Sequence, residues 1–160
     1  MVTFKQCYQT KNYKGVGLKT FQLTNYEGNW AILEEAYESL PAVVEPVEVE
    51  IQRFVEKWRR AWEEGILTTY LACYHPQFET GDMDHNQWQS YKRDLFKLSA
   101  KRNVQISDVH VQDNGSSAVV TFKQRYQTAK HEDLGLKTLH LRLHQDNWTI
   151  FKENWQPLSG

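Results

Sequence analysis

The sequence has little of several features that would point at once to a class of protein. Its 160 residues include only two cysteines, which form neither a disulfide framework nor a zinc-ligand spacing. The 19 Lys and Arg balance the 20 Asp and Glu, so the basic surface that nucleic-acid binding requires is missing. No apolar run approaches the roughly 20 residues that span a bilayer, and the opening MVTFKQ lacks the apolar core of a signal peptide. What is present, 40% apolar residues including six Trp, eight Tyr and seven Phe, indicates a packed globular protein.

The chain contains an internal repeat at a constant offset of 118 residues. Residues 2–10 (VTFKQCYQT) recur as residues 120–128 (VTFKQRYQT), and residues 17–20 (GLKT) recur as residues 135–138. Further identical pairs continue without a gap, namely Asn29 with Asn147, Trp30 with Trp148, Ile32 with Ile150, Glu35 with Glu153 and Leu40 with Leu158. We interpret the match as a duplicated module.

The two repeats differ in what precedes them. About eighty residues of helical and strand pattern lie before the second, whereas the first begins at residue 1 in the middle of a strand pattern. We expect residues 1–41 to be a partial domain, residues 42–47 a proline-flanked linker, and residues 48–160 a complete domain. A cut from a longer tandem array would give this arrangement.

Three helices are predicted after Pro46, which suits a helix start. Apolar residues spaced by three and four from Val47 to Trp62 predict an amphipathic helix that ends at Gly65. A shorter helix follows from Leu67 and ends before His75. Asp84 and Gln87 form a capping box for a third helix, which should end near residues 101–103.

Four strands follow, which gives an α+β chain. The first should contain a bulge near Ser107, and Asp113–Gly115 is a hairpin turn. Strands are then expected over residues 118–128, 137–143 and 148–155. Simple alternation in the last strand predicts Trp148 and Ile150 on one face, and Phe151, Glu153 and Trp155 on the other.

This order of elements resembles the NTF2-like (SnoaL-like, cystatin-like) superfamily, in which a curved antiparallel sheet wraps a long helix and leaves a conical pocket. Short motifs over residues 48–158 are similar to one branch, the NTF2-like module at the C-terminus of bacterial YkuD-type L,D-transpeptidases and of some tetratricopeptide-repeat envelope proteins. They are WRRAW (58–62), YLACY (70–74), FKQRY (122–126), GLK (135–137) and WTI (148–150), with Phe78, Trp88, Tyr91, Lys92, Glu153 and Trp155. The resemblance implies an NTF2-like cone of three helices on a curved sheet, preceded here by a partial three-stranded copy of that sheet.

The resemblance also implies a place and a role. It implies a periplasmic or cell-envelope location and a binding or scaffolding module accessory to peptidoglycan modification. The transpeptidase motif of His and Cys beside glycines is absent around Cys7 and Cys73, so we expect the accessory module and no catalytic residue. The expected partner is a small ligand or a peptidoglycan-related molecule, with no metal and no cofactor.

Candidate ligand contacts are mainly aromatic, because ring faces line pockets for cationic or amphipathic ligands. Trp58 is expected in the core, and Glu153 is either a pocket carboxylate or, as we favour, the ion-pair partner of Lys137, as Glu35 would be of Lys19. The candidate pocket residues are Trp58, Tyr70, Tyr74, Trp88, Lys92, Tyr126, Glu153 and Trp155.

The alternative is a SnoaL-like enzyme of the isomerase or dehydratase type. Such enzymes use a pocket Asp or His as general base. The residues available for that role are Asp84, His75, His85, His140 and His144. A pocket without a buried Asp or His would exclude this alternative.

The partial repeat presents a physical problem. Alternation places apolar residues on both of its faces, with Leu33 and Tyr37 opposite Trp30 and Ile32. An isolated three-stranded sheet is marginal in water, so something must cover it. We expect a homodimer, or a pseudo-dimer within the chain, formed through the sheets.

Overall fold

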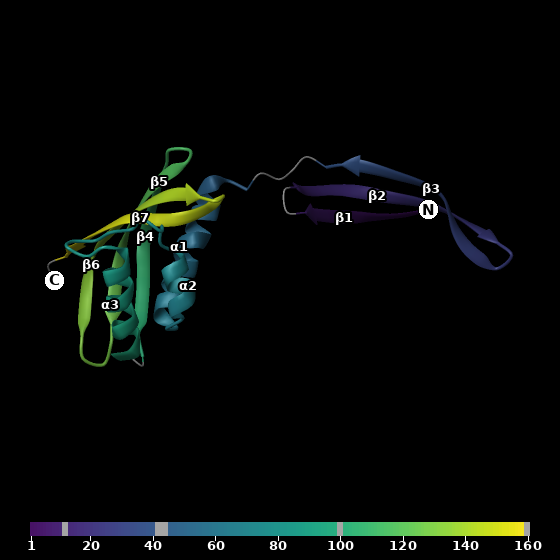
Figure 1. Ribbon diagram of the computed structural model, residues 1–160. Coiled ribbons are helices and arrows are strands. Elements are labelled where there is room, and N and C mark those ends of the chain that lie inside the picture. Colours follow the sequence, from purple (N-terminus) through teal and green to yellow (C-terminus); the bar gives the residue numbers. More distant parts are fainter. Residues whose placement is uncertain (11–12, 41–44, 99–100, 159–160) are drawn as a thin grey trace. The chain divides into compact units, whose positions relative to one another are not determined.

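The computed structural model describes residues 1–10, 13–40, 45–98 and 101–158. These residues form two compact units, Met1–Glu45 and Pro46–Gly160 (Figure 1). The fold is α+β, with three helices and two antiparallel sheets of three and four strands. The predicted α+β class is therefore confirmed. Residues 41–44, which include half of the expected linker (residues 42–47), lie outside the described residues.

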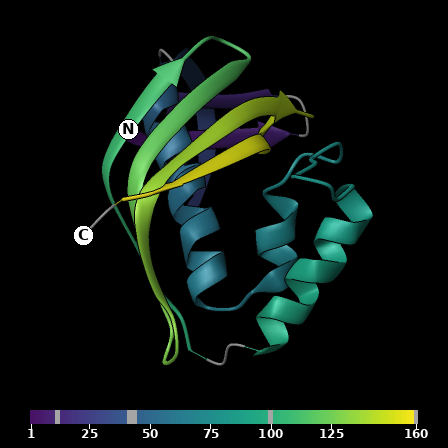
Figure 2. The ribbon, with the colours of Figure 1, turned by 90° about the vertical axis from the view of Figure 1, so that its left-hand side faces the viewer.

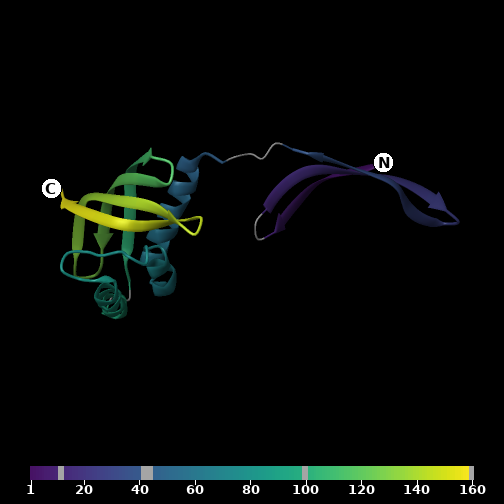
Figure 3. The same cartoon turned by 45° about the horizontal axis from the view of Figure 1, so that its top comes forward.

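The first unit is an antiparallel meander of β1 (Val2–Thr10), β2 (Tyr13–Tyr26) and β3 (Asn29–Ser39) (Figure 3). We call it the first meander. The turn between β2 and β3 holds Glu27 at φ 51° and Gly28 at φ 85°. Two successive positive φ values are what a two-residue hairpin turn with the right-handed twist of its strands requires.

The faces of the first meander differ from the prediction. A bulge at Gln22/Leu23 leaves Leu33 without a partner, because Gln22 pairs with Glu34 and Leu23 with Ile32. The extra residue restores Tyr37 to the face that carries Trp30 and Ile32. The expectation that Tyr37 lies on the opposite face was wrong for this reason. Simple alternation cannot anticipate a bulge.

The second unit begins with the helices α1 (Val47–Glu63), α2 (Leu67–Ala72) and α3 (His85–Leu98). Glu48 and Glu50 lie in the first turn of α1 and Arg60 in its last turn, which complements the helix dipole. After α1 the chain turns through Gly65 at φ 72°, as predicted for a residue beyond a helix end. The predicted end of α3 near residue 101 falls next to residues 99–100, which lie outside the described residues.

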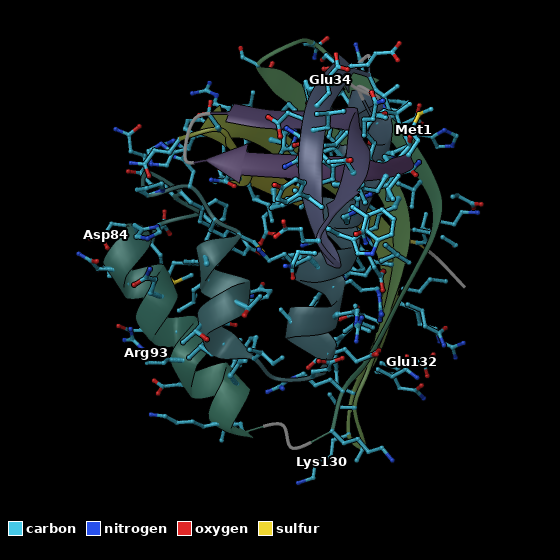
Figure 4. The ribbon with its side chains drawn as sticks, turned by 90° about the vertical axis from the view of Figure 1, so that its right-hand side faces the viewer. Met1, Glu34, Asp84, Arg93, Lys130 and Glu132 are labelled. Carbon is cyan, nitrogen blue, oxygen red and sulfur yellow. The ribbon has the colours of Figure 1, made fainter. Side chains whose placement is uncertain are left out.

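The predicted capping box at the start of α3 is confirmed. The Gln87 amide donates to Asp84 Oδ1 at 2.9 Å, and the Asp84 amide donates to Gln87 Oε1 at 3.0 Å. Figure 4 shows Asp84 at this end of α3 and Arg93 further along the helix. Asp84 thus has a structural role at the helix start.

The sheet of the second unit is ordered β4 (Asn103–Asp113), β5 (Ser117–Gln127), β6 (Glu132–His144) and β7 (Asn147–Pro157). The predicted bulge in β4 lies between Ser107 and His110. The sheet curves around α1, and α2 and α3 lie on the same side of it (Figure 2). Tyr74 extends the sheet locally through a parallel bridge to Ile150.

The core lies between α1 and the concave face of this sheet. Trp58, which the sequence places in the core, is fully buried, as are Phe122 of β5 and Ile150 of β7. Burying a large apolar side chain stabilises the fold by roughly 1.5–3 kcal/mol. The helices and the sheet of this unit therefore depend on one shared apolar layer.

A second bulge corrects the prediction for β7. His140 pairs with Lys152 and Leu141 with Ile150, so Phe151 is the extra residue. Glu153 consequently faces the same side as Ile150, toward the helices, and the expected separation of the two was wrong.

The strands of the second unit that correspond to the repeat have the register of the first meander. We call β5–β7 the second meander. Val2 pairs with Phe21 as Val120 pairs with Leu139, and Leu23 pairs with Ile32 as Leu141 pairs with Ile150. The bulges fall at the same place, between Gln22 and Leu23 and between His140 and Leu141. The two meanders therefore have the same strand pairing and the same bulge position, at an offset of 118 residues.

Candidate functional site

A cavity of about 360 Å³ opens beside α3. Its walls come from the C-terminal end of α1, from one face of α3 and from the β5–β6 hairpin, whose tip carries Lys130 and Glu132 (Figure 4). The residues that line it are Trp62, Tyr91, Lys92, Leu95, Phe96, Arg102, Tyr126, Thr128, His131 and Asp133. A cavity of this size with apolar walls and a few polar groups is the usual form of a small-ligand site.

Aromatic rings form the apolar wall. The rings of Trp62 and Tyr126 stack with their centroids 4.9 Å apart and an interplanar angle of 15°. Trp62 follows Trp58 by one helical turn, so α1 places one ring in the core and the next at the cavity. Phe96 of α3 continues the wall toward the interior through its contact with Tyr70, at 5.0 Å between centroids.

Lys92 is the cation at the inner end of the cavity. Its ammonium nitrogen lies 5.7 Å from the ring centroid of Tyr70 and 6.0 Å from that of Tyr91. Burial lowers the pKa of Lys92 below the usual value of 10.5, while the Glu153 carboxylate acts in the opposite direction. A buried ammonium attracts an anion more strongly than an exposed one, because water screens it less.

A hydrogen-bonded network lies behind Lys92. Trp58 Nε1 donates to Tyr74 Oη at 3.1 Å, and Tyr74 Oη donates to Glu153 Oε2 at 3.1 Å. Since the single proton of Tyr74 is given to Glu153, the Tyr70 hydroxyl, at 2.9 Å, must donate to Tyr74. Glu153 also forms an ion pair with Lys137 at 3.4 Å, which confirms the predicted pairing.

The tyrosines of this network stay protonated. Burial raises the pKa of Tyr70 and Tyr74 well above 10, and the nearby Glu153 carboxylate acts in the same direction. Burial likewise raises the pKa of the Cys73 thiol to about 11. Cys73 is a buried core residue, as predicted, and its Sγ donates to Thr69 O at 3.3 Å.

Polar groups from the hairpin and from Arg102, just before β4, complete the cavity. His131 Nε2 lies 2.9 Å from Asp133 Oδ2, while Asp133 Oδ1 is buried and has no hydrogen-bond partner. Arg102 donates to Phe96 O at 2.7 Å and lies over the Phe96 ring at 4.6 Å. Arg102 thereby holds the C-terminal end of α3, and Lys92 is the lysine of the cavity lining.

The eight residues predicted as ligand contacts fall into three groups. Lys92 and Tyr126 line the cavity. Trp58, Tyr70, Tyr74 and Trp88 lie buried in the core. Glu153 belongs to the network behind Lys92, and Trp155 is partly exposed at the edge of the sheet, with Lys137 Nζ 5.7 Å from its ring centroid. Their roles as ligand contacts remain predictions.

Sequence reasoning missed several residues of the cavity. The predicted ligand contacts did not include Trp62, Tyr91, Phe96, Arg102, His131 or Asp133. A usable signal was present on α3, since Tyr91, Leu95 and Phe96 share a face with Lys92 at helical spacing. The hairpin residues gave no such signal, because their position depends on where the β5–β6 turn lies.

The histidines considered for catalysis lie elsewhere. His75 and His144 contact each other with ring centroids 4.9 Å apart, and burial is the largest cause that lowers the pKa of His75. His85 Nδ1 lies 3.2 Å from Phe78 O, and His140 Nε2 lies 3.4 Å from Asn154 Nδ2. None of these four lines the cavity beside α3.

Two further observations concern the described residues alone. Within them, no group of three or more His, Cys, Asp or Glu is placed to hold a metal ion. None of the helices over the described ranges is long and apolar enough to cross a membrane.

Comparison with known proteins identifies the second unit. The family model described as the Cds6 C-terminal NTF2-like domain matches residues 50–154. No curated protein sequence is similar enough to count as a match.

Among solved structures, Bdellovibrio bacteriovorus Bd1075 is 28% identical with a TM-score of 0.66 and covers 78% of this chain and 45% of its own. The helical cell shape determining protein Pgp2 of Campylobacter jejuni (K307A mutant) is 21% identical with a TM-score of 0.62, covering 67% and 40% respectively. A putative NTF2-like dehydratase from Streptomyces avermitilis is 16% identical with a TM-score of 0.62, covering 71% and 98%. The chain thus corresponds to less than half of the first two proteins, and the likenesses to the last two concern the fold.

Proposed function

The chain belongs to the family of Cds6 C-terminal NTF2-like domains, and from that premise we propose that it is a non-catalytic binding module of a bacterial cell-envelope protein. In this proposal the second unit is the complete NTF2-like cone, and it binds a small peptidoglycan-related ligand in the cavity beside α3. A periplasmic location and a role accessory to peptidoglycan modification, including an association with L,D-transpeptidases, form part of the proposal.

The observation that carries the proposal is the pairing of aromatic walls with the ammonium group of Lys92, which the surrounding side chains shield from water. Ring faces such as the Trp62–Tyr126 stack offer flat apolar surfaces to a sugar or a side chain. Lys92 at the inner end offers a positive charge to a carboxylate. A muropeptide combines sugar rings with carboxylates, so its chemistry fits both parts of the cavity.

The relatives support the envelope context. Pgp2 of Campylobacter jejuni is a protein that determines helical cell shape, and cell shape in bacteria is a property of the envelope.

Support for a non-catalytic role comes from the groups near the cavity. Glu153 is paired with Lys137 and accepts the Tyr74 proton, both at Oε2, and it does not line the cavity. Tyr70 and Tyr74 are buried and protonated, and Cys73 is a thiol at neutral pH. General acid–base catalysis needs a group whose pKa lies near the working pH and which can reach the substrate.

The alternative is a SnoaL-like isomerase or dehydratase, and one observation favours it. His131 and Asp133 lie 2.9 Å apart on the cavity wall, and Asp133 Oδ1 is buried without a partner. A carboxylate that orients a histidine is an arrangement that general bases use. This alternative would be established if the unmodified protein converts a bound ligand to a product and the Asp133→Asn variant does not.

Titration of the full chain with a disaccharide tetrapeptide muropeptide tests the proposal. We expect NMR shifts in the Trp62 and Tyr126 rings, and an affinity at least tenfold weaker in Lys92→Met but largely kept in Lys92→Arg. Affinity should fall as the pH rises through the lowered pKa of Lys92, because only the protonated ammonium attracts the carboxylate.

The matched control is Lys97→Met on the same helix, where the side chain is exposed and ion-paired with Asp94. It should leave the affinity unchanged. Equal affinities in Lys92→Met and Lys97→Met, or shifts confined to residues outside the cavity, would contradict the proposal. A ligand whose own NMR spectrum changes with time would favour the enzyme.

A further inference from the structure

One face of the first meander is apolar and exposed. The register places Val2, Phe4, Phe21, Leu23, Trp30 and Ile32 on this face, together with Lys19, Glu35 and Tyr37. Trp30 is 72% exposed and Ile32 55%. Exposed apolar patches of this kind mark interaction surfaces.

The same face of the second meander is occupied by helices. Phe122, which corresponds to Phe4, is fully buried and lies with its ring centroid 6.0 Å from that of Trp58 on α1. Trp148 and Ile150, which correspond to Trp30 and Ile32, are 6% and 0% exposed. Ile51 and Val55 of α1 belong to the same buried cluster.

Identity between the two meanders is concentrated on this face. The identical inward pairs are Val2 and Val120, Phe4 and Phe122, Gln6 and Gln124, Gly17 and Gly135, Lys19 and Lys137, Leu23 and Leu141, Trp30 and Trp148, Ile32 and Ile150, and Glu35 and Glu153. The outward positions have diverged more, as in Cys7 and Arg125, Gln22 and His140, Thr24 and Arg142, Glu34 and Lys152, and Ala36 and Asn154. Some outward pairs are also identical, such as Thr3 with Thr121 and Lys5 with Lys123, and the inward Phe21 and Tyr37 correspond to Leu139 and Trp155. The larger share of identity nevertheless lies on the face that contacts the helices in the second meander.

A charged pair on this face limits what kind of polypeptide can cover it. Lys19 Nζ lies 3.1 Å from Glu35 Oε1, at the positions of the Lys137–Glu153 pair. In the second meander Glu153 also accepts the Tyr74 hydroxyl proton from the segment after α2. A charged pair buried in an interface needs such additional hydrogen bonds, which a helical layer with a hydroxyl donor supplies and an apolar sheet face does not.

A second copy of the chain cannot supply that layer without loss. Over the residues that the structure describes, each chain has two meanders and one set of helices, and α1 already buries Ile51, Val55 and Trp58 against its own sheet. If those helices moved to the first meander of another chain, the second meander of their own chain would lose its helical layer.

We infer that the apolar face of the first meander is the docking site for a helical layer of the α1–α3 type, supplied by polypeptide other than residues 1–160. That layer carries an apolar stripe with the spacing of Ile51, Val55 and Trp58 on an amphipathic helix. It also carries a hydroxyl donor placed as Tyr74 is, opposite Glu35. Together they form a second cone, whose sheet is the first meander.

The test adds a second α1–α3 layer to the chain, at the spacing that α1–α3 have from the second meander. Because residue 1 corresponds to residue 119, a fusion that places residues 46–118 directly before Met1 of the full chain provides a second α1–α3 unit with its β4. We expect the backbone amides of β2 to exchange at least 100-fold more slowly in the fusion than in the unmodified chain, and the fusion to be monomeric.

Two matched variants of the fusion give the control. Phe4→Asp, on the apolar face, should abolish the added protection, whereas Lys5→Asp, on the opposite face, should keep it. Unchanged exchange of β2 in the fusion would overturn the inference. Strong protection of β2 in the unmodified chain would also overturn it. If that chain is dimeric, the result favours a second copy as the cover; if it is monomeric, the result favours cover by the chain's own second unit.

An exchanged chain keeps the inference falsifiable if the fusion fails to fold. In it, residues 119–157 of the full chain are replaced by residues 1–39, so that the first meander is placed directly after β4. We expect the amides of α1 to stay protected within about tenfold of the unmodified chain. Loss of protection in α1 would show that this face cannot hold the helices.

Discussion

The first and second meanders share strand register, a bulge at the same position and most inward side chains, but they differ in burial. Phe4 is 40% exposed and Phe122 is fully buried. Since most inward side chains are the same in both, the difference comes from what packs against the sheet. Strand pairing and bulge position are thus encoded locally, whereas the stability of a sheet of this kind depends on its helical layer.

The largest expected difference between the two meanders is at the paired phenylalanines. Phe122→Ala should lower the free energy of unfolding by about 3–5 kcal/mol, because it leaves a cavity against Trp58. Phe4→Ala should change it by less than about 1 kcal/mol, because its ring already contacts solvent. Urea unfolding of the full chain measures both, with the exchange of β6 amides reporting the second meander and the exchange of β2 amides reporting the first. Similar losses in the two variants would show that the face of the first meander is already covered.

A smaller difference is expected at the paired carboxylates. Glu153→Gln should cost about 1–3 kcal/mol, since it leaves Lys137, whose side chain is only 10% exposed, without its counter-charge. Glu35→Gln should change the free energy of unfolding by less than about 0.5 kcal/mol, because Glu35 is 58% exposed. The same urea titration applies. A cost at Glu35 equal to that at Glu153 would contradict the proposed difference in environment.

Much of the fold could be predicted because its signals are local. The capping box of Asp84 and Gln87, the turn after α1 at Gly65 and the repeat itself depend on residues close in sequence or on direct identity. The Lys137–Glu153 pair was predicted as well, because both residues recur as Lys19 and Glu35.

The errors came from features that local alternation cannot reveal. One extra residue, Phe151, reverses the side on which Glu153 lies and so brings its carboxylate to Tyr74. Leu33 has the same effect on Tyr37. The cavity was only partly predicted because Lys92, Trp62 and His131 meet through tertiary packing of α1, α3 and the β5–β6 hairpin.

Native-state hydrogen exchange on the unmodified chain compares the central strands of the two meanders directly. We predict that amides of β6 exchange only through global unfolding of the second unit, while the corresponding amides of β2 exchange at least 100-fold faster. Equal protection of β2 and β6 would contradict this, since the first meander would then need no helical layer from elsewhere.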